Sequence, residues 1–400
     1  MNATDVVILG AARTPIGRYG GAFRNVHAAE LGAVAARSAI SRAGIDPDVI
    51  DEVIIGHARQ AGSGPNPGRQ VARRAGLRDA VPAQTLNKAC ASGLQSIASA
   101  AQAILTGESA VVLAGGIESM SRMPYLIDSE DARWGHRMGN FTLVDAMYRD
   151  GFTCSLCGMI MGETAELLAR EYGITREASD AYAVETQRRA AAAIADGRFR
   201  DEIAPVTTVD AKGQPTVVDL DEHPRPETSV ESLGKLPPVF PSVEGQTGII
   251  TAGTSSGITD GGAAVVVTSG SRASALGLKP LARITGWASA GVDPRRMGIG
   301  PVPAIRKLFA RTGLTMADFD LVELNEAFAP QVLAVLRDEP IPSEKLNVNG
   351  GAIALGHPIG CTGTRVVVTL VHEMRRRGAR RGLATLCVSG GMGMAMALEI

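Results

Sequence analysis

The chain has 400 residues, 45% of them hydrophobic, and this length predicts two or three packed units rather than one core. Lys and Arg number 40 against 41 Asp and Glu, a formal net charge of −1 that gives no overall basic signal for nucleic acid or acidic lipid. Five cysteines are too few for a disulfide framework and odd in number, so we expect free thiols and a cytoplasmic location. We expect no signal peptide, and no apolar run reaches the roughly 18 to 20 residues of a membrane span.

Strand-like and helix-like stretches alternate along the first part of the chain. Helical spacing of apolar residues predicts helices at 28–43, ended by Gly44, at 68–75, and from Cys90 to Gly107. β-Branched and apolar runs predict strands at 5–9, 49–55, 81–86 and 110–114. The alternation predicts an α/β fold with a largely parallel sheet.

Residues 119–248 differ in composition, being richer in charge, Met, Pro and aromatic residues. Helices are predicted at 163–172 and at 176–197, the second with Thr175 as its N-cap. The Pro-rich stretch 224–241 is predicted to be irregular. We interpret this block as an inserted, largely surface-facing module, after which the α/β alternation resumes.

The last quarter of the chain repeats a pattern of the first half. The shared order is cysteine, helix, glycine, strand and glycine pair, at Cys90, Gly107 and Gly115-Gly116 in the first copy and at Cys361, Gly378 and Gly390-Gly391 in the second. The copies are only weakly similar in sequence. They predict a duplicated α/β domain whose equivalent loops surround one cleft.

Cys90 lies in Asn87-Lys-Ala-Cys-Ala-Ser-Gly, at the predicted start of a helix. A thiol at a helix N-terminus lies in the field of unpaired N–H groups, which predicts a lowered pKa and a reactive thiolate. A small buried cysteine that fills the helix start is an equally good interpretation of this stretch alone.

Three residues of the second half are further candidates for chemistry. His357 lies among glycines and before Pro358, which favours a functional role over that of a structural histidine in a turn. Cys387 ends a strand-like run before a Gly-rich loop and can reach a cleft, although a core position is the simpler interpretation. Asn325 follows an apolar run, where an amide can orient a water or donate to an oxyanion, or can be a turn residue.

Together these groups are suited to acyl transfer. Cys90 would form a thioester, His357 would accept its proton and Cys387 would move a second proton. Backbone N–H groups near the glycines would stabilise the developing oxyanion. Cys154 and Cys157 have the spacing of half a zinc or redox site, but no second pair exists, so we expect no metal.

Along essentially the whole chain the motifs resemble those of the thiolases (acetyl-CoA C-acyltransferases). The matching stretches are Gly10-Ala-Ala-Arg-Thr-Pro-Ile-Gly, Asn87-Lys-Ala-Cys-Ala-Ser-Gly, Gly115-Gly-Ile-Glu-Ser-Met-Ser, Met161-Gly-Glu-Thr-Ala-Glu, Asn325-Glu-Ala-Phe-Ala, Asn349-Gly-Gly-Ala-Ile-Ala-Leu-Gly-His-Pro-Ile-Gly and Cys387-Val-Ser-Gly-Gly-Met-Gly. The resemblance implies a five-layered αβαβα fold of two related halves with an inserted loop domain. It also implies acyl transfer between coenzyme A (CoA) thioesters, by thiolysis of a 3-ketoacyl-CoA or by Claisen condensation of acetyl-CoA, with CoA as a substrate and no cofactor.

The resemblance assigns the catalytic roles. Cys90 matches the acylated nucleophile, and His357 matches the residue that activates it and contributes to an oxyanion site. Cys387 matches the acid/base that deprotonates the acetyl methyl in synthesis or protonates the leaving enolate in cleavage. Asn325 matches the residue that holds a water in the first oxyanion hole, and the second hole would use the N–H groups of Cys90 and Ser389.

Substrate contacts follow from the same resemblance. Arg225 and Ser232 match positions at the nucleotide end of CoA, and Ser256 matches a contact to the pantetheine. The substrate-binding set also includes Met161, Phe328 and Ser389.

Three positions depart from the family pattern. Ser389 replaces a usual Gly, of which only the N–H is needed. Ile160 stands where members specific for acetoacetyl-CoA have a His before Met-Gly, which weakens strict acetoacetyl-CoA specificity and leaves a wider or more apolar acyl pocket open. Thr254 replaces a frequent Asn.

We expect three units: an N-terminal half at 1–121 plus 250–270, an inserted CoA-binding loop domain at 122–249, and a C-terminal half at 271–400. The expected partners are acyl-CoA, CoA and further copies of the chain in a homodimer or homotetramer. Rival functions are a cysteine acyl-hydrolase, a synthase with another acyl donor, and a non-catalytic acyl-CoA-binding protein.

Overall fold

The structure, a computed structural model, describes residues 4–209, 212–240, 243 and 245–400. Its strands are β1 (Val6–Arg13), β2 (Gly17–Arg18), β3 (Glu52–His57), β4 (Ala83–Leu86), β5 (Val111–Ser119), β6 (Tyr125–Leu126), β7 (Val144–Asp145), β8 (Val206–Val209), β9 (Pro215–Val218), β10 (Thr259–Ser269), β11 (Ala282–Gly291), β12 (Leu321–Leu324), β13 (Arg381–Val388) and β14 (Met392–Glu399). Its α-helices are α1 (Ala28–Ala43), α2 (Pro67–Arg74), α3 (Ser92–Thr106), α4 (Ser129–Arg133), α5 (Met161–Glu171), α6 (Arg176–Ala195), α7 (Val230–Gly234), α8 (Gly270–Ala275), α9 (Pro301–Thr312), α10 (Ala329–Asp338), α11 (Ala352–Leu355) and α12 (Ile359–Arg377). Short 3₁₀ or π turns lie at Pro47–Val49, Met120–Arg122, Tyr148–Phe152, Pro294–Ile299 and Met316–Asp318.

Two halves of the main sheet share one pairing pattern. In the first half β1 and β5 both pair antiparallel with β10, and β3 pairs parallel with β5 and β4. In the second half β11 and β13 both pair antiparallel with β14, and β12 pairs parallel with β13. A parallel bridge between Val322 and Leu346 takes the place of the β3–β4 pairing. The predicted duplication is confirmed, but each half is mixed rather than largely parallel, because an antiparallel strand lies at its centre.

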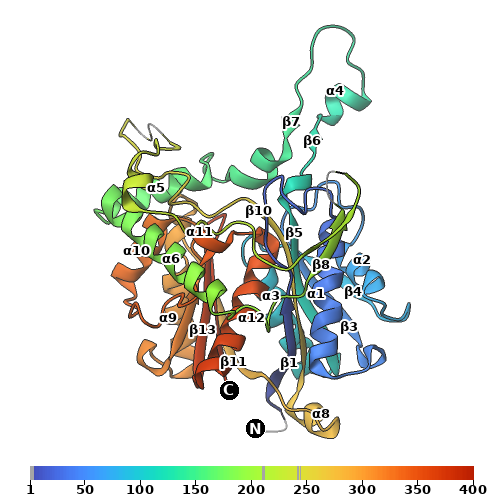
Figure 1. Cartoon of the computed structure of the whole chain (residues 1–400). Helices are drawn as coiled ribbons and strands as arrows, with labels where there is room; N and C mark the ends of the chain where they lie inside the picture. Colours follow the sequence, from blue (N-terminus) through green and yellow to red (C-terminus); the bar gives the residue numbers. More distant parts are fainter. Residues whose placement is uncertain (1–3, 210–211, 241–242, 244) are drawn as a thin grey trace.

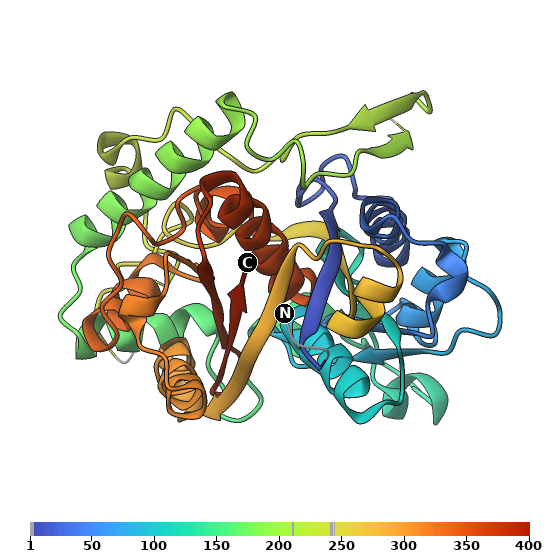
Figure 2. The same cartoon turned by 90° about the horizontal axis from the view of Figure 1, so that it is seen from below.

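The elements form five layers (Figures 1 and 2). Helices α3 and α12 pack between the two halves of the sheet, with α1 and α2 outside the first half and α9 and α10 outside the second. The central core joins apolar residues of both halves, such as Leu94, Val112, Val367 and Leu386. This arrangement confirms the predicted αβαβα fold.

Glycines end the helices that the sequence places before strands. Gly44, Gly107 and Gly378 follow α1, α3 and α12 with φ of 69°, 75° and 66°, the left-handed conformation in which glycine lacks the strain of a side chain. The repeat keeps one offset here, since 361 − 90 and 378 − 107 both equal 271. The predicted equivalence of the glycine pairs is wrong: Gly115-Gly116 lies inside β5, whereas Gly390-Gly391 forms the turn between β13 and β14.

The two central helices meet at glycines, which sets the geometry of the site. A Cβ atom at Gly93 would lie 2.6 Å from Thr364 N, and one at Gly363 would overlap Leu94 N. Only glycine allows this close approach. It brings together the start of α3, which follows Cys90, and the start of α12, which follows His357.

Residues 122–249 contribute no described strand to the main sheet. β6 and β7 pair as an arm that projects from the body of the molecule (Figure 1), and β8 pairs with β9. Helix α6 begins where predicted, since Thr175 Oγ1 accepts a hydrogen bond from Ala178 N at 3.2 Å. The predicted irregular stretch 224–241 contains α7, which reciprocal hydrogen bonds between Ser229 and Ser232 cap. None of the described helices combines the length and the apolar character needed to cross a bilayer.

Candidate active site

A cavity of about 680 Å³ opens beside the starts of α3 and α12. Segments from the first half, the second half and the stretch between them contribute to its wall. The predicted residues that line it are Cys90, Met161, Arg225, Ser256, Phe328, His357, Cys387 and Ser389. Asn325 lies buried beside His357, and Ser232 lies in a neighbouring pocket.

Cys90 lies in a tight turn rather than in the first turn of the helix. Ala89 has a φ of 45°, a left-handed conformation that is strained for alanine. Asn87 Oδ1 accepts from Ala89 N at 2.9 Å and supports the turn. Helix α3 begins only at Ser92, so Cys90 precedes the N-cap residue, Ala91. The half-buried thiol is thereby turned toward the cavity.

The protonation of Cys90 also differs from the sequence prediction. Burial raises the pKa of the Cys90 thiol above its ordinary value. A hydrogen bond from the backbone N–H of Ser389 and the charge of Arg59 act in the opposite direction, but do not outweigh burial. The resting residue is therefore a thiol, and a base must remove its proton.

His357 is held as a neutral imidazole. Its Nδ1 lies 2.6 Å from Thr362 Oγ1, which itself donates to Pro358 O at 3.0 Å. Because that hydroxyl proton is already committed, we assign the imidazole proton to Nδ1 and the lone pair to Nε2. Burial, followed by the charges of Arg365 and Arg59, lowers the pKa of His357 to about 3. The imidazole is therefore neutral near pH 7, and its Nε2 carries a lone pair.

Adjacent parallel strands bring Asn325 and Cys387 together. Leu324 pairs with Thr385 in β12 and β13, so the next residues along both strands reach the same end of the sheet. Asn325 Nδ2 lies 3.5 Å from His357 Nε2, and Asn325 Oδ1 has no hydrogen-bond partner among the described residues. Burial and the neighbouring Cys90 raise the pKa of Cys387, which is therefore also a thiol.

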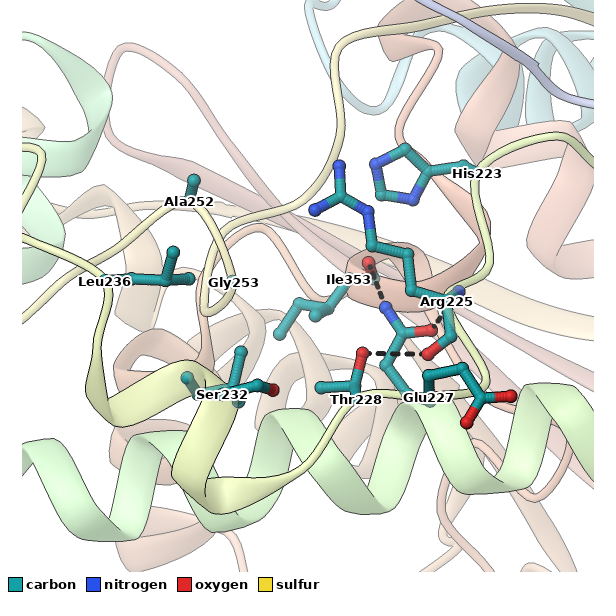
Figure 3. A pocket seen from close by; sticks show the side chains of 11 residues that line it. His223, Arg225, Glu227, Thr228, Ser232, Leu236, Ala252, Gly253 and Ile353 are labelled. Atoms are coloured by element: carbon teal, nitrogen blue, oxygen red, sulfur yellow. Dashed lines mark hydrogen bonds between the residues drawn. The ribbon is translucent and has the colours of Figure 1, made fainter.

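A second pocket of about 270 Å³ adjoins the first and shares His223, Arg225 and Ala252 with it. Figure 3 shows how Arg225 is held there: its backbone N donates to Gln187 Oε1 at 2.8 Å, and its carbonyl accepts from Thr228 Oγ1 at 2.8 Å. Backbone contacts thus fix Arg225, and the residue lines both pockets. Ser232 lines this second pocket.

Two residues near the site had no role in the sequence prediction. Thr362 follows His357 by five residues, and its helical position after Pro358 was the available signal. Arg59 lines the cavity, but nothing in its local sequence points there. Among the described residues no group of three or more His, Cys, Asp or Glu could hold a metal ion, and Cys154 and Cys157 find no further ligand.

The fold and the cavity define an acyltransferase of the thiolase fold, and comparison with known proteins identifies the family. Residues 6–271 match the model of the thiolase N-terminal domain and residues 278–400 match that of the C-terminal domain. The chain belongs to the thiolase family. It transfers acyl groups between CoA thioesters.

Relatives and solved structures agree with this assignment. The chain is 51% identical to acetyl-CoA acetyltransferase of Chromobacterium violaceum and 50% identical to that of Escherichia coli, covering 99% of both chains in each comparison. The crystal structure of Bacillus anthracis acetyl-CoA acetyltransferase matches with a TM-score of 0.94 at 44% identity, over 99% of this chain and 98% of that chain. Human mitochondrial 3-ketoacyl-CoA thiolase in complex with CoA matches with a TM-score of 0.93 at 42% identity, over 100% and 99%.

Proposed function

We propose that Cys90 is the residue that becomes acylated and that His357 is its base. The observation that supports this most directly is a half-buried thiol sharing one cavity with a neutral imidazole whose Nε2 carries a lone pair. In cleavage Cys90 Sγ attacks the 3-keto carbon of the substrate, the bond between C2 and C3 breaks, and the Cys90 proton passes to His357. In condensation Cys90 Sγ attacks the thioester carbonyl of acetyl-CoA instead and again gives its proton to His357. The C–S bond to CoA breaks, and CoA leaves as a thiol with that proton.

Cys387 is proposed to act in the step that forms or breaks the carbon–carbon bond. In condensation it removes a proton from the methyl of a second acetyl-CoA, and in cleavage it protonates the enolate that leaves. Its position at the end of β13, in the wall of the same cavity, supports this role. Because its resting pKa is raised, Cys387 begins as a proton donor, the state that cleavage of a 3-ketoacyl-CoA requires.

Two oxyanion sites complete the proposal. The N–H groups of Cys90 and Ser389 form one, which is supported by their effect on the Cys90 thiol, because both N–H groups lower its pKa. His357 and a water positioned by Asn325 form the other, and the unpartnered Asn325 Oδ1 is a suitable acceptor for such a water.

CoA is proposed to extend from this cavity into the neighbouring pocket, with Ser256 against the pantetheine and Arg225 and Ser232 near the nucleotide. Arg225 supports this path because it lines both pockets and can pair with a phosphate. Ser256 is fixed by a backbone hydrogen bond to Ala327 O at 3.0 Å.

The proposed acyl groups are longer than acetoacetyl. Ile160, Met161 and Phe328 line the cavity with apolar side chains, and Ile160 stands where specificity for acetoacetyl-CoA goes with a histidine. Such a wall favours methylene groups by about 0.8 kcal/mol each when they are fully buried.

An assay of 3-ketoacyl-CoA thioesters of increasing chain length tests the proposal. We expect CoA-dependent cleavage at several lengths, with little release of free acid. Release of free acid without a requirement for CoA would instead indicate a cysteine hydrolase. Binding of acyl-CoA without turnover at any length would indicate a non-catalytic protein.

We also propose an oligomeric assembly, domain limits and a cellular location for the chain. A homodimer or homotetramer is supported by the arm around β6 and β7, where Tyr125, Trp134 and Met138 are exposed. The inserted unit 122–249 is supported by its separate small sheets. A cytoplasmic location is supported by five free cysteines.

A further inference from the structure

Arg59 is a buried arginine in the wall of the catalytic cavity, and none of the roles above uses it. The residue is only 7% exposed. Its Nη1 donates to Asp150 O at 3.1 Å, whereas its Nε has no hydrogen-bond partner among the described residues. A buried guanidinium that lacks acceptors is costly, so its presence calls for an explanation.

No described carboxylate pairs with this guanidinium. Glu118 accepts from the backbone N–H of Arg59, not from its side chain. Glu118 is also engaged by His57 Nε2 at 3.0 Å and by Gly360 N at 2.9 Å. No described carboxylate therefore neutralises the charge of Arg59, which lines the cavity.

The charges of the cavity wall favour an anion. Arg18, Arg59 and Arg225 line the cavity, and its described lining contains no Asp or Glu. Arg225 also lines the neighbouring pocket and Arg18 is exposed, whereas Arg59 is buried. Burial is the largest influence on the pKa of Cys90 and of His357, and the Arg59 charge lowers both. Arg59 lines the same cavity as Cys90, and Ala58, the residue before it, packs in one cluster with Cys90, so Arg59 lies near the acylated residue.

Apolar residues surround the Cys90 thiol on the side of the cavity where Arg59 lies. Cys90 packs in one cluster with Ala58, Phe152 and Ile359, and Ala58 directly precedes Arg59. Methylene groups of an acyl chain on Cys90 would be buried against this cluster. A chain that follows it would bring its far end toward the guanidinium.

Gly151 provides the space in which the guanidinium lies. A Cβ atom at Gly151 would come within 2.8 Å of Arg59 Nε and 3.2 Å of Nη2. The preceding residue, Asp150, supplies the carbonyl that holds Nη1. The guanidinium is therefore fixed on its Nη1 side, while Nε and Nη2 make no hydrogen bond with the described residues.

We propose that Arg59 binds a carboxylate at the far end of the acyl group, so that CoA thioesters of 3-oxo dicarboxylic acids are preferred substrates. The inference rests on the proposed thiolysis at Cys90 and adds the class of acyl group. A guanidinium edge with two N–H groups matches the two oxygens of a carboxylate. Binding of this anion satisfies the donors that the protein leaves without partners.

The test compares two thioesters of equal chain length, the CoA thioesters of 3-oxohexanedioic acid and of 3-oxohexanoic acid. Thiolysis by the wild-type protein should show a higher kcat/KM for the dicarboxylic thioester. Arg59→Met should lower the ratio of the two kcat/KM values about 10- to 100-fold, the usual effect of losing a charge-assisted hydrogen bond. The ratio cancels any effect of Arg59 on Cys90 itself, because both substrates react there.

Two further variants separate recognition from folding. Gly151→Ala keeps the charge but displaces the guanidinium, so it should lower the same ratio even if Arg59→Met fails to fold. Arg18→Met removes an exposed arginine of the same cavity and should change both kcat/KM values by a similar factor, leaving the ratio within about threefold.

The outcomes are distinct. An equal preference for both thioesters in the wild-type protein, or an unchanged ratio in Arg59→Met and Gly151→Ala, overturns the assignment of Arg59 while leaving the thiolysis intact. Turnover of neither thioester, nor of any other 3-ketoacyl-CoA, overturns the proposed thiolysis and this inference with it.

Discussion

Cys90 and Cys361 occupy equivalent positions in the two halves, 271 residues apart, but their surroundings are opposite. Helix α3 begins two residues after Cys90, whereas α12 begins two residues before Cys361. The first thiol therefore lies in a turn at the cavity, and the second lies in the central core, 1% exposed, where burial raises its pKa to about 12. A shift in where the helix begins, not the position in the repeat, decides which cysteine is accessible.

The largest expected effect is that of Cys90→Ala. Loss of the nucleophile should abolish covalent labelling by acyl-CoA and lower turnover by roughly 10⁴- to 10⁶-fold. Mass spectrometry of the protein after incubation with acetyl-CoA measures the label. Stoichiometric acylation that persists in this variant would refute the role of Cys90 and its functional difference from Cys361.

Cys387→Ala should separate the two chemical steps. The variant should still be acylated at Cys90 but lose carbon–carbon cleavage by about 10²- to 10⁴-fold, the usual contribution of general acid–base catalysis. Labelling by acetyl-CoA and thiolysis of a 3-ketoacyl-CoA, measured side by side, check this. Equal loss of both activities would argue against a separate role for Cys387.

Acid should destabilise the protein through His357. Its pKa rises from about 3 in the folded protein to about 6.5 when unfolded, so the unfolded chain binds this proton first as pH falls. The stabilisation that comes from keeping His357 neutral is complete above pH 6.5 and is lost toward pH 3. The free energy of unfolding should therefore fall by about 3 kcal/mol between pH 6.5 and pH 4.

Denaturant unfolding at pH 7 and pH 4 measures this loss. His357→Asn should lose less stability than the wild-type protein over this range, because asparagine does not titrate. If both proteins lose the same amount, the histidine is not the buried neutral base that distinguishes the surroundings of Cys90.

Thr362→Val should weaken the base without removing it. The loss of the acceptor for Nδ1–H frees the His357 tautomer and should cost about 1–2 kcal/mol, a factor of roughly 5–30 in the rate of acylation. Thr364→Val is the matched control on the same helix, since Thr364 Oγ1 donates to Gly93 O rather than to the histidine. Equal slowing of acylation in both variants would point to packing instead of the tautomer.

The smallest effect on activity is expected for Cys361→Ala. The substitution leaves a small cavity in the central core and should cost about 1 kcal/mol of stability, with acylation and thiolysis within about twofold of the wild-type values. Thermal unfolding and the same labelling assay measure both. A loss of labelling comparable with that of Cys90→Ala would show that the two cysteines are not functionally distinct.

Local sequence predicted much of the fold because the relevant forces act over a few residues. Gly44 ends α1 and Thr175 caps α6 through contacts within their own turns. The order and direction of the strands in the sheet were harder to predict, since β10 pairs with both β1 and β5, which lie more than a hundred residues away in the chain. The same applies to Gly390-Gly391, whose turn depends on the β13–β14 pairing.

The chemical identity of the site residues was evident in the sequence, whereas their protonation states were not. The family, the duplicated architecture and the candidate residues Cys90, His357 and Cys387 could be predicted from the sequence alone. That both cysteines rest as thiols and that His357 is neutral follows from the folded structure, because burial and distant charges set those pKa values. The guanidinium of Arg59, whose Nε has no partner among the described residues, likewise depends on contact with Gly151, 151 − 59 = 92 residues further along the chain. Such through-space effects depend on packing between distant segments, which local sequence does not encode.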